Sequence, residues 1–338
     1  MRNWRKIWSA ALLTLVILMV AGCGANNPTT NNATNGKANN SSNQAVEQNG
    51  NNGNAEEAQL TAYPLIVKDD FGTEITFDAA PQKIVSLSPS ETEGLFAIGL
   101  DEQIVGVSDN DDYPEAALSK PKMGGFQVNV ESVVAAEPDL VLVTGTMIKQ
   151  ETIKSLTDLG INVFLSNPKT IADVMEHIKT IGQITDHQAE ADQVVKQMQD
   201  ELNQVTEAVK SVKEEDKKKV YIEFSPGWTV GKGEFMDEMI TLAGGVNVAS
   251  DVEGWSQINE ENIIKANPDV ILYAKSVIEN DKTLAEIIKG RSGWDQIAAV
   301  KNDQVIGMDD NLLSRPGPRL TKGLIEVAKA IYPELMQP

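Results

Sequence analysis

The sequence is short of cysteine and histidine, and each shortage excludes a kind of site. Cys23 is the only cysteine, so no intrachain disulfide can form and the fold must rest on its hydrophobic core. The two histidines, His177 and His187, are too few for a direct zinc or manganese site, which needs clustered ligands. We expect both to be solvated on helix surfaces, and we expect neither a metal nor a cofactor.

Positive charge is scarce as well. Lysine and arginine number 29 against 49 aspartates and glutamates, which gives a net charge of −20 over 338 residues. Nucleic acid would be repelled, because phosphate binding needs a basic patch. The motifs of serine hydrolases, zinc proteases and phosphate-binding loops are also missing. An enzyme is therefore not predicted, and a secreted enzyme is the less favoured alternative.

The N-terminus reads as an export signal. Three basic residues precede an apolar run over 10–20, which is too short to span a bilayer comfortably. Cys23 follows directly after Val20-Ala21-Gly22, and this resembles the lipobox of bacterial lipoproteins, in which the cysteine is acylated. We predict a signal peptide over 1–22 and a lipid anchor at Cys23, so that the protein is held on the outer face of the cell membrane. A single-pass anchor helix is the alternative.

Residues 23–62 are rich in Asn, Gly, Ala, Ser and Thr and have few large apolar side chains. Such a segment cannot bury enough surface to order itself, so we predict a disordered linker. The remainder of the chain, 63–338, has the composition of a folded protein.

An internal repeat organises the folded part. Residues 129–142 read NVESVVAAEPDLVL and residues 259–272 read NEENIIKANPDVIL. In each copy an Asn should cap a short helix, a Glu should occupy its first turn, and Pro-Asp should end it before a buried strand. A second repeat pairs KIVSLSP at 83–89 with KVYIEFSP at 219–226, each followed by a helical pattern. Alternating strands and helices predict one parallel α/β sheet per lobe.

Apolar residues recur with a helical period from Ala189 to Lys213 without Gly or Pro. Because this stretch lies between the repeated units, we predict a connecting helix within 189–216 that joins lobes at 63–188 and 217–338. An ordinary surface helix of one domain is the alternative.

With these features the chain resembles the iron-chelate and cobalamin class of ABC-transporter substrate-binding proteins. The resemblance rests on DDFGTEITF at 69–77, KIVSLSPSETEGLFAIGL at 83–100, VGVSDNDDYP at 105–114, WTVGKGEFMDEMITLAGG at 228–245, SRPGPRL at 314–320 and the two repeated units. It implies a class III periplasmic-binding-protein fold, in which two three-layer α/β lobes are joined by one long backbone helix. The cobalamin-binding branch looks closest.

The resemblance also implies partners. Two glutamates of the family, one per lobe, form salt bridges with arginines of the permease, and Glu131 and Glu261 lie at those positions. Helix N-terminal acids that only favour the helix dipole are the alternative. A monomer is expected to work with an ABC permease and, through it, a cytoplasmic ATPase.

Ligands of open α/β sheets bind beyond the carboxyl ends of the strands, here between the lobes. Aromatic faces suit a large planar or greasy ligand, and an arginine suits an anionic group. The candidate ligand-binding residues are Tyr113, Phe126, Phe224, Trp228, Trp255 and Arg315. Phe224 is as consistent with core packing as with binding, Trp294 is predicted to be a core residue, and Arg319 is predicted to be structural. The predicted ligand is cobalamin or a related corrinoid, and a ferric siderophore or haem remains open.

Overall fold

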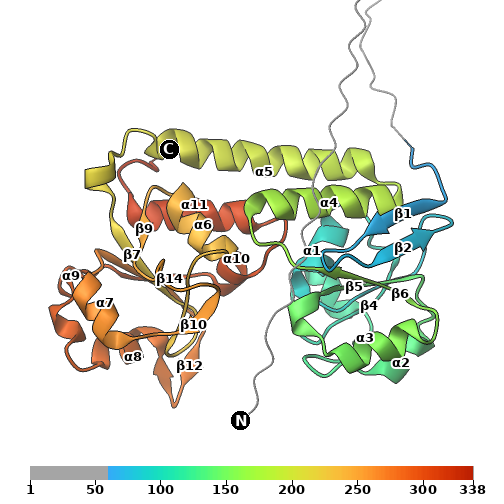
Figure 1. The fold of residues 1–338 in the computed structure, drawn as a ribbon, viewed down its shortest axis with the longest axis horizontal. Helices are drawn as coiled ribbons and strands as arrows, with labels where there is room; N and C mark the ends of the chain where they lie inside the picture. The colour runs from blue at the N-terminus through green and yellow to red at the C-terminus, as the bar shows by residue number, and fades with distance from the viewer. Residues whose placement is uncertain (1–59, 338) are drawn as a thin grey trace, which may run out of the picture. The chain divides into compact units, whose positions relative to one another are not determined.

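The computed structural model describes residues 60–337. The predicted signal peptide, the lipidation site Cys23 and nearly all of the predicted linker lie outside the described residues. The described part contains two separate four-stranded parallel sheets, each built from its own half of the chain (Figure 1). The expected α/β class is therefore confirmed.

The first lobe is a three-layer unit. Its sheet has the strand order β4-β3-β5-β6. Side chains of β5 point alternately to two faces. Leu140 and Leu142 pack in the cluster that includes α1 and α4, whereas Val141 and Val143 pack in the cluster that includes α2 and α3. The strands and helices of this lobe are β1 Leu65–Lys68, β2 Glu74–Phe77, β3 Ile84–Ser86, α1 Pro89–Ala97, β4 Ile104–Val107, α2 Val130–Ala135, β5 Leu140–Thr144, α3 Gln150–Thr157, β6 Asn162–Ser166 and α4 Ile171–Thr185.

The second lobe repeats this plan with the strand order β14-β11-β7-β9. One face of the sheet packs on α6 and α11, and the other on α7, α8 and Trp294. Trp294 is fully buried, which confirms its prediction as a core residue. The strands and helices here are β7 Lys219–Glu223, β8 Trp228–Val230, α6 Phe235–Leu242, β9 Val246–Asn247, β10 Trp255–Gln257, α7 Glu260–Ala266, β11 Val270–Ala274, β12 Ile278–Glu279, β13 Lys282–Thr283, α8 Leu284–Gly290, α9 Ala298–Lys301, β14 Val305–Met308, α10 Asp310–Ser314 and α11 Leu320–Ile331.

The repeated sequence units form the same local structure twice. The side chain of Asn129 accepts a hydrogen bond from Ser132 N at the start of α2, and Asn259 accepts one from Asn262 N at the start of α7, both at 3.1 Å. The aspartate of each Pro-Asp pair then accepts a hydrogen bond from a backbone N–H at the start of the neighbouring strand, which is Lys83 N just before β3 and Lys219 N in β7. Asp139 Oδ2 lies 2.9 Å from Lys83 N, and Asp269 Oδ2 lies 2.8 Å from Lys219 N. The predicted helix caps are confirmed.

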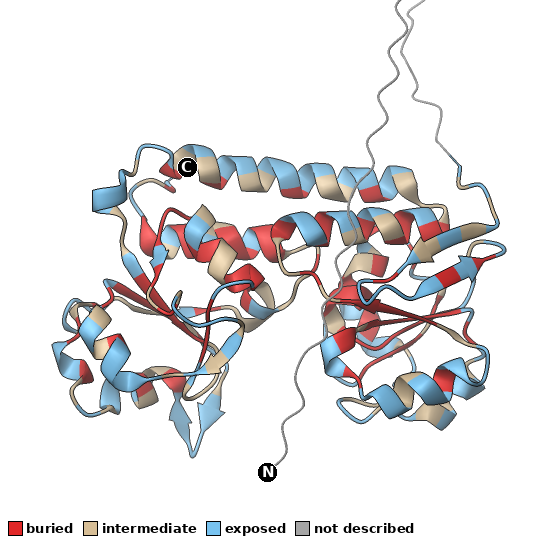
Figure 2. Ribbon diagram, in the orientation of Figure 1, coloured by how far each residue is buried: buried red, intermediate tan, exposed pale blue. Residues whose placement is uncertain are grey.

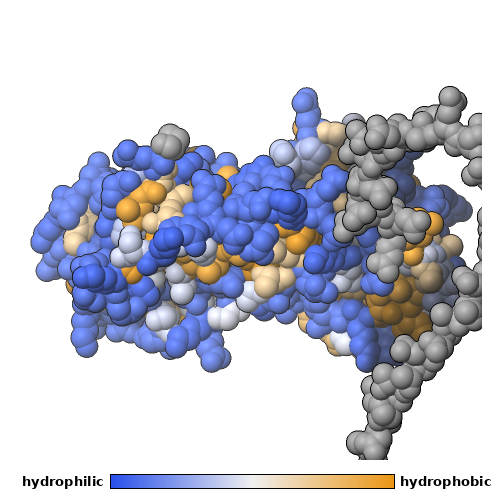
Figure 3. All heavy atoms as spheres, turned by 90° about the horizontal axis from the view of Figure 1, so that it is seen from above, coloured by the Kyte–Doolittle hydropathy of each residue, from blue (hydrophilic) through white to orange (hydrophobic). Residues whose placement is uncertain are grey.

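One long helix, α5 (Gln188–Val209), connects the lobes. It ends before the apolar period over 189–213 does, and before the end of the segment 189–216 predicted to hold it. After Val209 the chain turns, with Val212 N donating to Val209 O, and enters the charged 3₁₀ turn Glu214–Asp216. Figure 2 shows the helix buried on the side that faces the lobes and exposed on the other. Figure 3, seen from above, shows a largely hydrophilic surface there.

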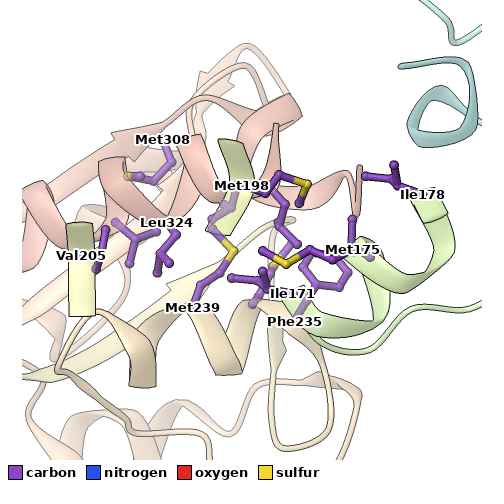
Figure 4. Packing of buried hydrophobic residues seen from close by; sticks show 14 of the residues in the cluster. Ile171, Met175, Ile178, Met198, Val205, Phe235, Met239, Met308 and Leu324 are labelled. Atoms are coloured by element: carbon purple, nitrogen blue, oxygen red, sulfur yellow. The ribbon is translucent and has the colours of Figure 1, made fainter. Parts of the chain in front are cut away.

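The lobes also share an apolar seam. Side chains from both lobes and from α5 belong to one hydrophobic cluster. Figure 4 shows its centre, where α4, α5, α6 and α11 meet. The labelled seam residues from these helices are Ile171, Met175, Ile178, Met198, Val205, Phe235, Met239 and Leu324. Because a close-packed seam resists sliding, it favours a fixed angle between the lobes.

Candidate functional site

The carboxyl ends of the two parallel sheets face each other. Glu93 follows β3 in the first lobe, and it pairs with Arg319, which follows β14 in the second. Lys169 follows β6, and its Nζ lies 2.8 Å from Glu234 Oε1, just before α6. These contacts place segments that follow the strands of one lobe against those of the other. This is the location where open α/β sheets bind ligands.

Trp228 and Trp255 form an exposed aromatic face in the second lobe. They lie on the antiparallel pair β8 and β10, where Trp228 is opposite Gln257 and Trp255 is opposite Val230. That register makes the two tryptophans diagonal neighbours on one face of the pair. Their exposed fractions are 39% and 40%, large for side chains of this size. The face can therefore stack against a bulky ligand.

Phe224 supports this face from behind. It is half-buried and packs against the hydrophobic core. Its ring meets Trp255 edge-to-face at a centroid distance of 4.6 Å, and Phe235 contacts the same tryptophan at 6.2 Å. The contacts therefore give Phe224 a packing role that orients Trp255.

The aromatic candidates of the first lobe lie apart from the tryptophans. Phe126 is 70% exposed, on the loop between the bridged residues Gly124 and Val128. Tyr113 lies beneath Arg319, with the guanidinium carbon 3.7 Å from the ring centroid. Tyr113 also lines a pocket of about 270 Å³ between α1, α5 and the start of α11. Among the described residues no ring contact joins Tyr113 or Phe126 to Trp228 or Trp255.

Arg315 belongs to an interlobe ion cluster that we define as Glu93, Asp112, Arg315 and Arg319. Arg319 binds Glu93 through two hydrogen bonds of 2.8 and 2.7 Å. Arg315 Nη1 lies 3.1 Å from Glu93 Oε1 and 2.6 Å from Asp112 Oδ1. Burial alone would raise the pKa of Asp112, but Arg315 outweighs it and the pKa is lowered. The hydrogen bond to Glu93 raises the pKa of Arg319.

The prediction that the histidines are solvated is wrong. His177 Nε2 lies 2.8 Å from Glu91 Oε2, and both side chains are almost fully buried beside Pro316–Pro318. Burial opposes both charges, but the paired opposite charge outweighs it, so the pKa of Glu91 is lowered and that of His177 is raised. His187 is half-buried, with Nδ1 2.7 Å from Thr185 O just before α5.

A second buried ion pair supports the Trp228 loop. Glu223, at the end of β7, is fully buried and binds Arg291 through two bonds of 2.7 and 2.5 Å. Its carboxylate also accepts bonds from the Tyr221 hydroxyl and from Gly227 N, at 2.8 and 2.9 Å. Gly227 has φ +76°, a conformation that favours glycine, and directly precedes Trp228. The buried carboxylate thus fixes the turn that presents the tryptophan.

Glu131 and Glu261 are exposed in the first turns of α2 and α7. These helices lie in different lobes, and both are on the side of the molecule away from α5 (Figure 1). The two carboxylates are therefore accessible on equivalent parts of the repeated unit.

Sequence reasoning missed Glu93, Asp112 and the Glu223–Arg291 pair. Glu93 and Arg315 are 222 positions apart, so no local pattern links them. Glu223 ends β7, whose central residues are apolar. An acid at the end of such a strand is the signal that could have indicated a buried ion pair.

Neither a metal site nor a spanning helix is found in the described part. No three or more His, Cys, Asp or Glu side chains within 60–337 are grouped to hold a metal ion. No helix in the same range is long and apolar enough to cross a membrane.

The fold and the facing sheet edges are those of a two-lobed solute-binding protein, and comparisons with known proteins agree. Residues 84–312 match the family described as periplasmic binding protein. An uncharacterised ABC transporter substrate-binding lipoprotein of Bacillus subtilis, YvrC, is 35% identical over 99% of both chains. A cobalamin-binding protein of Halobacterium salinarum is 30% identical over 82% of this chain and 77% of its own length.

Among solved structures, a possible iron-binding periplasmic solute-binding protein of Staphylococcus epidermidis is 34% identical, with a TM-score of 0.64. The match covers 75% of this chain and 99% of that one. The chain therefore belongs to the periplasmic binding protein family, the substrate-binding proteins of ABC transporters. These three relatives are named as binding proteins, not as enzymes.

Proposed function

We propose that this protein captures cobalamin or a related corrinoid between its lobes and delivers it to an ABC permease. The observation that supports this most is the Trp228–Trp255 face, which lies at the carboxyl end of its sheet and leaves both rings partly exposed. A corrin ring is large and flat, and aromatic faces bind such surfaces well. The Halobacterium salinarum relative named for cobalamin binding supports the same ligand.

A ferric siderophore or haem is the second candidate. It is favoured by the Staphylococcus epidermidis structure, which is described as possibly iron-binding. Both kinds of ligand are bulky chelates, so both would use the same aromatic face.

Delivery completes the proposal. Glu131 and Glu261 are the proposed contacts with permease arginines, because they are exposed and equivalent in the two lobes. An acylated Cys23 would hold the monomer on the outer face of the cell membrane, and the Bacillus subtilis relative of matching length is named a lipoprotein. The permease would couple transport to a cytoplasmic ATPase.

Calorimetric titration of the purified protein with cyanocobalamin, ferrichrome and haem tests the ligand. We expect saturable binding of cyanocobalamin with the highest affinity of the three. Trp228→Ala and Trp255→Ala should each weaken the binding of cyanocobalamin about 10- to 100-fold, because tryptophans that a ligand or partner covers contribute about that much to affinity. Leu159→Ala, which removes an exposed apolar side chain just after α3, is the control and should leave affinity unchanged. Tighter binding of ferrichrome or haem would favour the second candidate, and binding insensitive to both tryptophans would contradict the proposed site.

A further inference from the structure

The two arginines nearest the facing sheet edges are already neutralised. Both oxygens of Glu93 bind arginine, and its side chain is only 2% exposed. Asp112 supplies the second carboxylate, so the interlobe ion cluster holds two positive and two negative charges. An anionic ligand group beside this cluster would therefore meet no net positive charge, and it would be repelled by the two protein carboxylates. Separating Glu93 from its arginines to free a positive charge would leave a buried carboxylate unpaired, which is strongly unfavourable.

The ion cluster joins the lobes. Glu93 belongs to α1 and Asp112 follows β4, both in the first lobe, whereas Arg315 and Arg319 lie between β14 and α11 in the second. Gly317, between the arginines, approaches Ser90 so closely that a side chain there would meet its carbonyl oxygen at 3.2 Å. Tyr113 covers the face of Arg319. Both arginines are therefore already paired with carboxylates of the first lobe, and these pairs hold the lobes together.

Hydrogen-bond donors remain on Arg315. Only its Nη1 has partners within residues 60–337, namely Glu93 and Asp112. Its Nε and Nη2 can donate to an uncharged acceptor, such as an amide or hydroxamate carbonyl, without separating any ion pair. The net charge of −20 for the chain adds a field that disfavours anions.

We propose that the interlobe ion cluster holds the two lobes together and selects for a bulky ligand that has carbonyl acceptors and no net negative charge. This inference rests on the proposed function and deepens it by naming the chemical class of ligand. It favours corrinoids with intact side-chain amides and trihydroxamate ferric chelates. It disfavours tricatecholate chelates and haem, whose propionates are anionic.

Two matched ligand pairs test the inference at low salt. The first pair is cyanocobalamin and its monocarboxylate, in which one side-chain amide is hydrolysed. The second is ferrichrome, a neutral trihydroxamate, and ferric enterobactin, a trianionic tricatecholate. In whichever pair binds, the neutral member should bind at least about tenfold more tightly, since unmatched charge at an interface disfavours the wrong partner.

Asp112→Asn should reduce the ratio of the two affinities within a pair. It removes one of the two carboxylates, so the ion cluster gains a net positive charge that can attract the anionic ligand. Asp112 is about half-exposed, so folding should tolerate the change. Asp200→Asn removes the same charge on the exposed side of α5 and should leave the ratio unaltered. Equal or tighter binding of the anionic member, or equal effects of the two variants, would overturn the inference alone. If none of the four ligands bound, the proposed function would be overturned and this inference with it.

Discussion

Reversing the two proposed docking charges, Glu131→Arg together with Glu261→Arg, is expected to abolish ligand uptake by cells while the affinity of the purified protein for the ligand stays unchanged. Both side chains are exposed in the first turns of α2 and α7, and neither is among the candidate ligand residues. The permease arginines proposed to pair with the glutamates would instead face like charges, which costs several kcal/mol at an interface. Uptake of labelled cyanocobalamin, compared with calorimetric affinity, measures the two effects separately.

The fold should survive this double reversal. An acid in the first turn of a helix contributes only about 0.3–1 kcal/mol, and the Asn129 and Asn259 caps remain. The matched control is Glu190→Arg with Glu207→Arg on α5, which changes the net charge equally and includes a first-turn acid. Control cells should take up ligand normally. Normal uptake by the Glu131/Glu261 variant, or an equal loss in the control, would contradict the docking role.

Replacing Glu223 by alanine is expected to lower the free energy of unfolding by about 3–5 kcal/mol, because it leaves the buried Arg291 with only its longer contact to Glu260, at 3.5 Å. The Tyr221 hydroxyl and Gly227 N also lose their acceptor. Urea denaturation measures the loss. Affinity for the ligand should fall too, since the Gly227 turn that presents Trp228 loses its anchor.

Two further variants separate burial from charge. Glu223→Gln keeps an acceptor for Gly227 N and should lose less stability than alanine. Asp158→Ala removes one partner of an exposed pair with Lys154 and should change stability by at most about 1 kcal/mol. A loss of less than about 1 kcal/mol for Glu223→Ala would contradict the structural role given to this ion pair.

Local signals predicted much of the fold. The helix caps at Asn129 and Asn259, the buried strands after each Pro-Asp and the burial of Trp294 all follow from short patterns, and the structure contains each of them. The end of α5 was predicted too late because Val212 continues the apolar period while the chain already turns. An apolar period indicates which side chains pack against the core, and Val212 can do so from a turn as well as from a helix.

Contacts between distant segments could not be predicted. The pairing of Glu93 with Arg315 and Arg319 depends on how the two lobes meet, and the sequence alone indicates only that there are two. His177 lies at the edge of the apolar stripe of α4, where a solvated and a buried position look alike. Its partner Glu91 comes from α1, 86 positions away.

A structure of the protein with cyanocobalamin bound tests the central claim most directly. We expect the ligand between the facing sheet edges, with a ring face against Trp228 and Trp255. The Glu93–Arg319 bonds and the apolar seam should be intact, because both oppose a large rotation of the lobes. Ligand bound elsewhere, such as in the pocket beside α5, or a large hinge rotation that separates Glu93 from Arg319, would contradict this account.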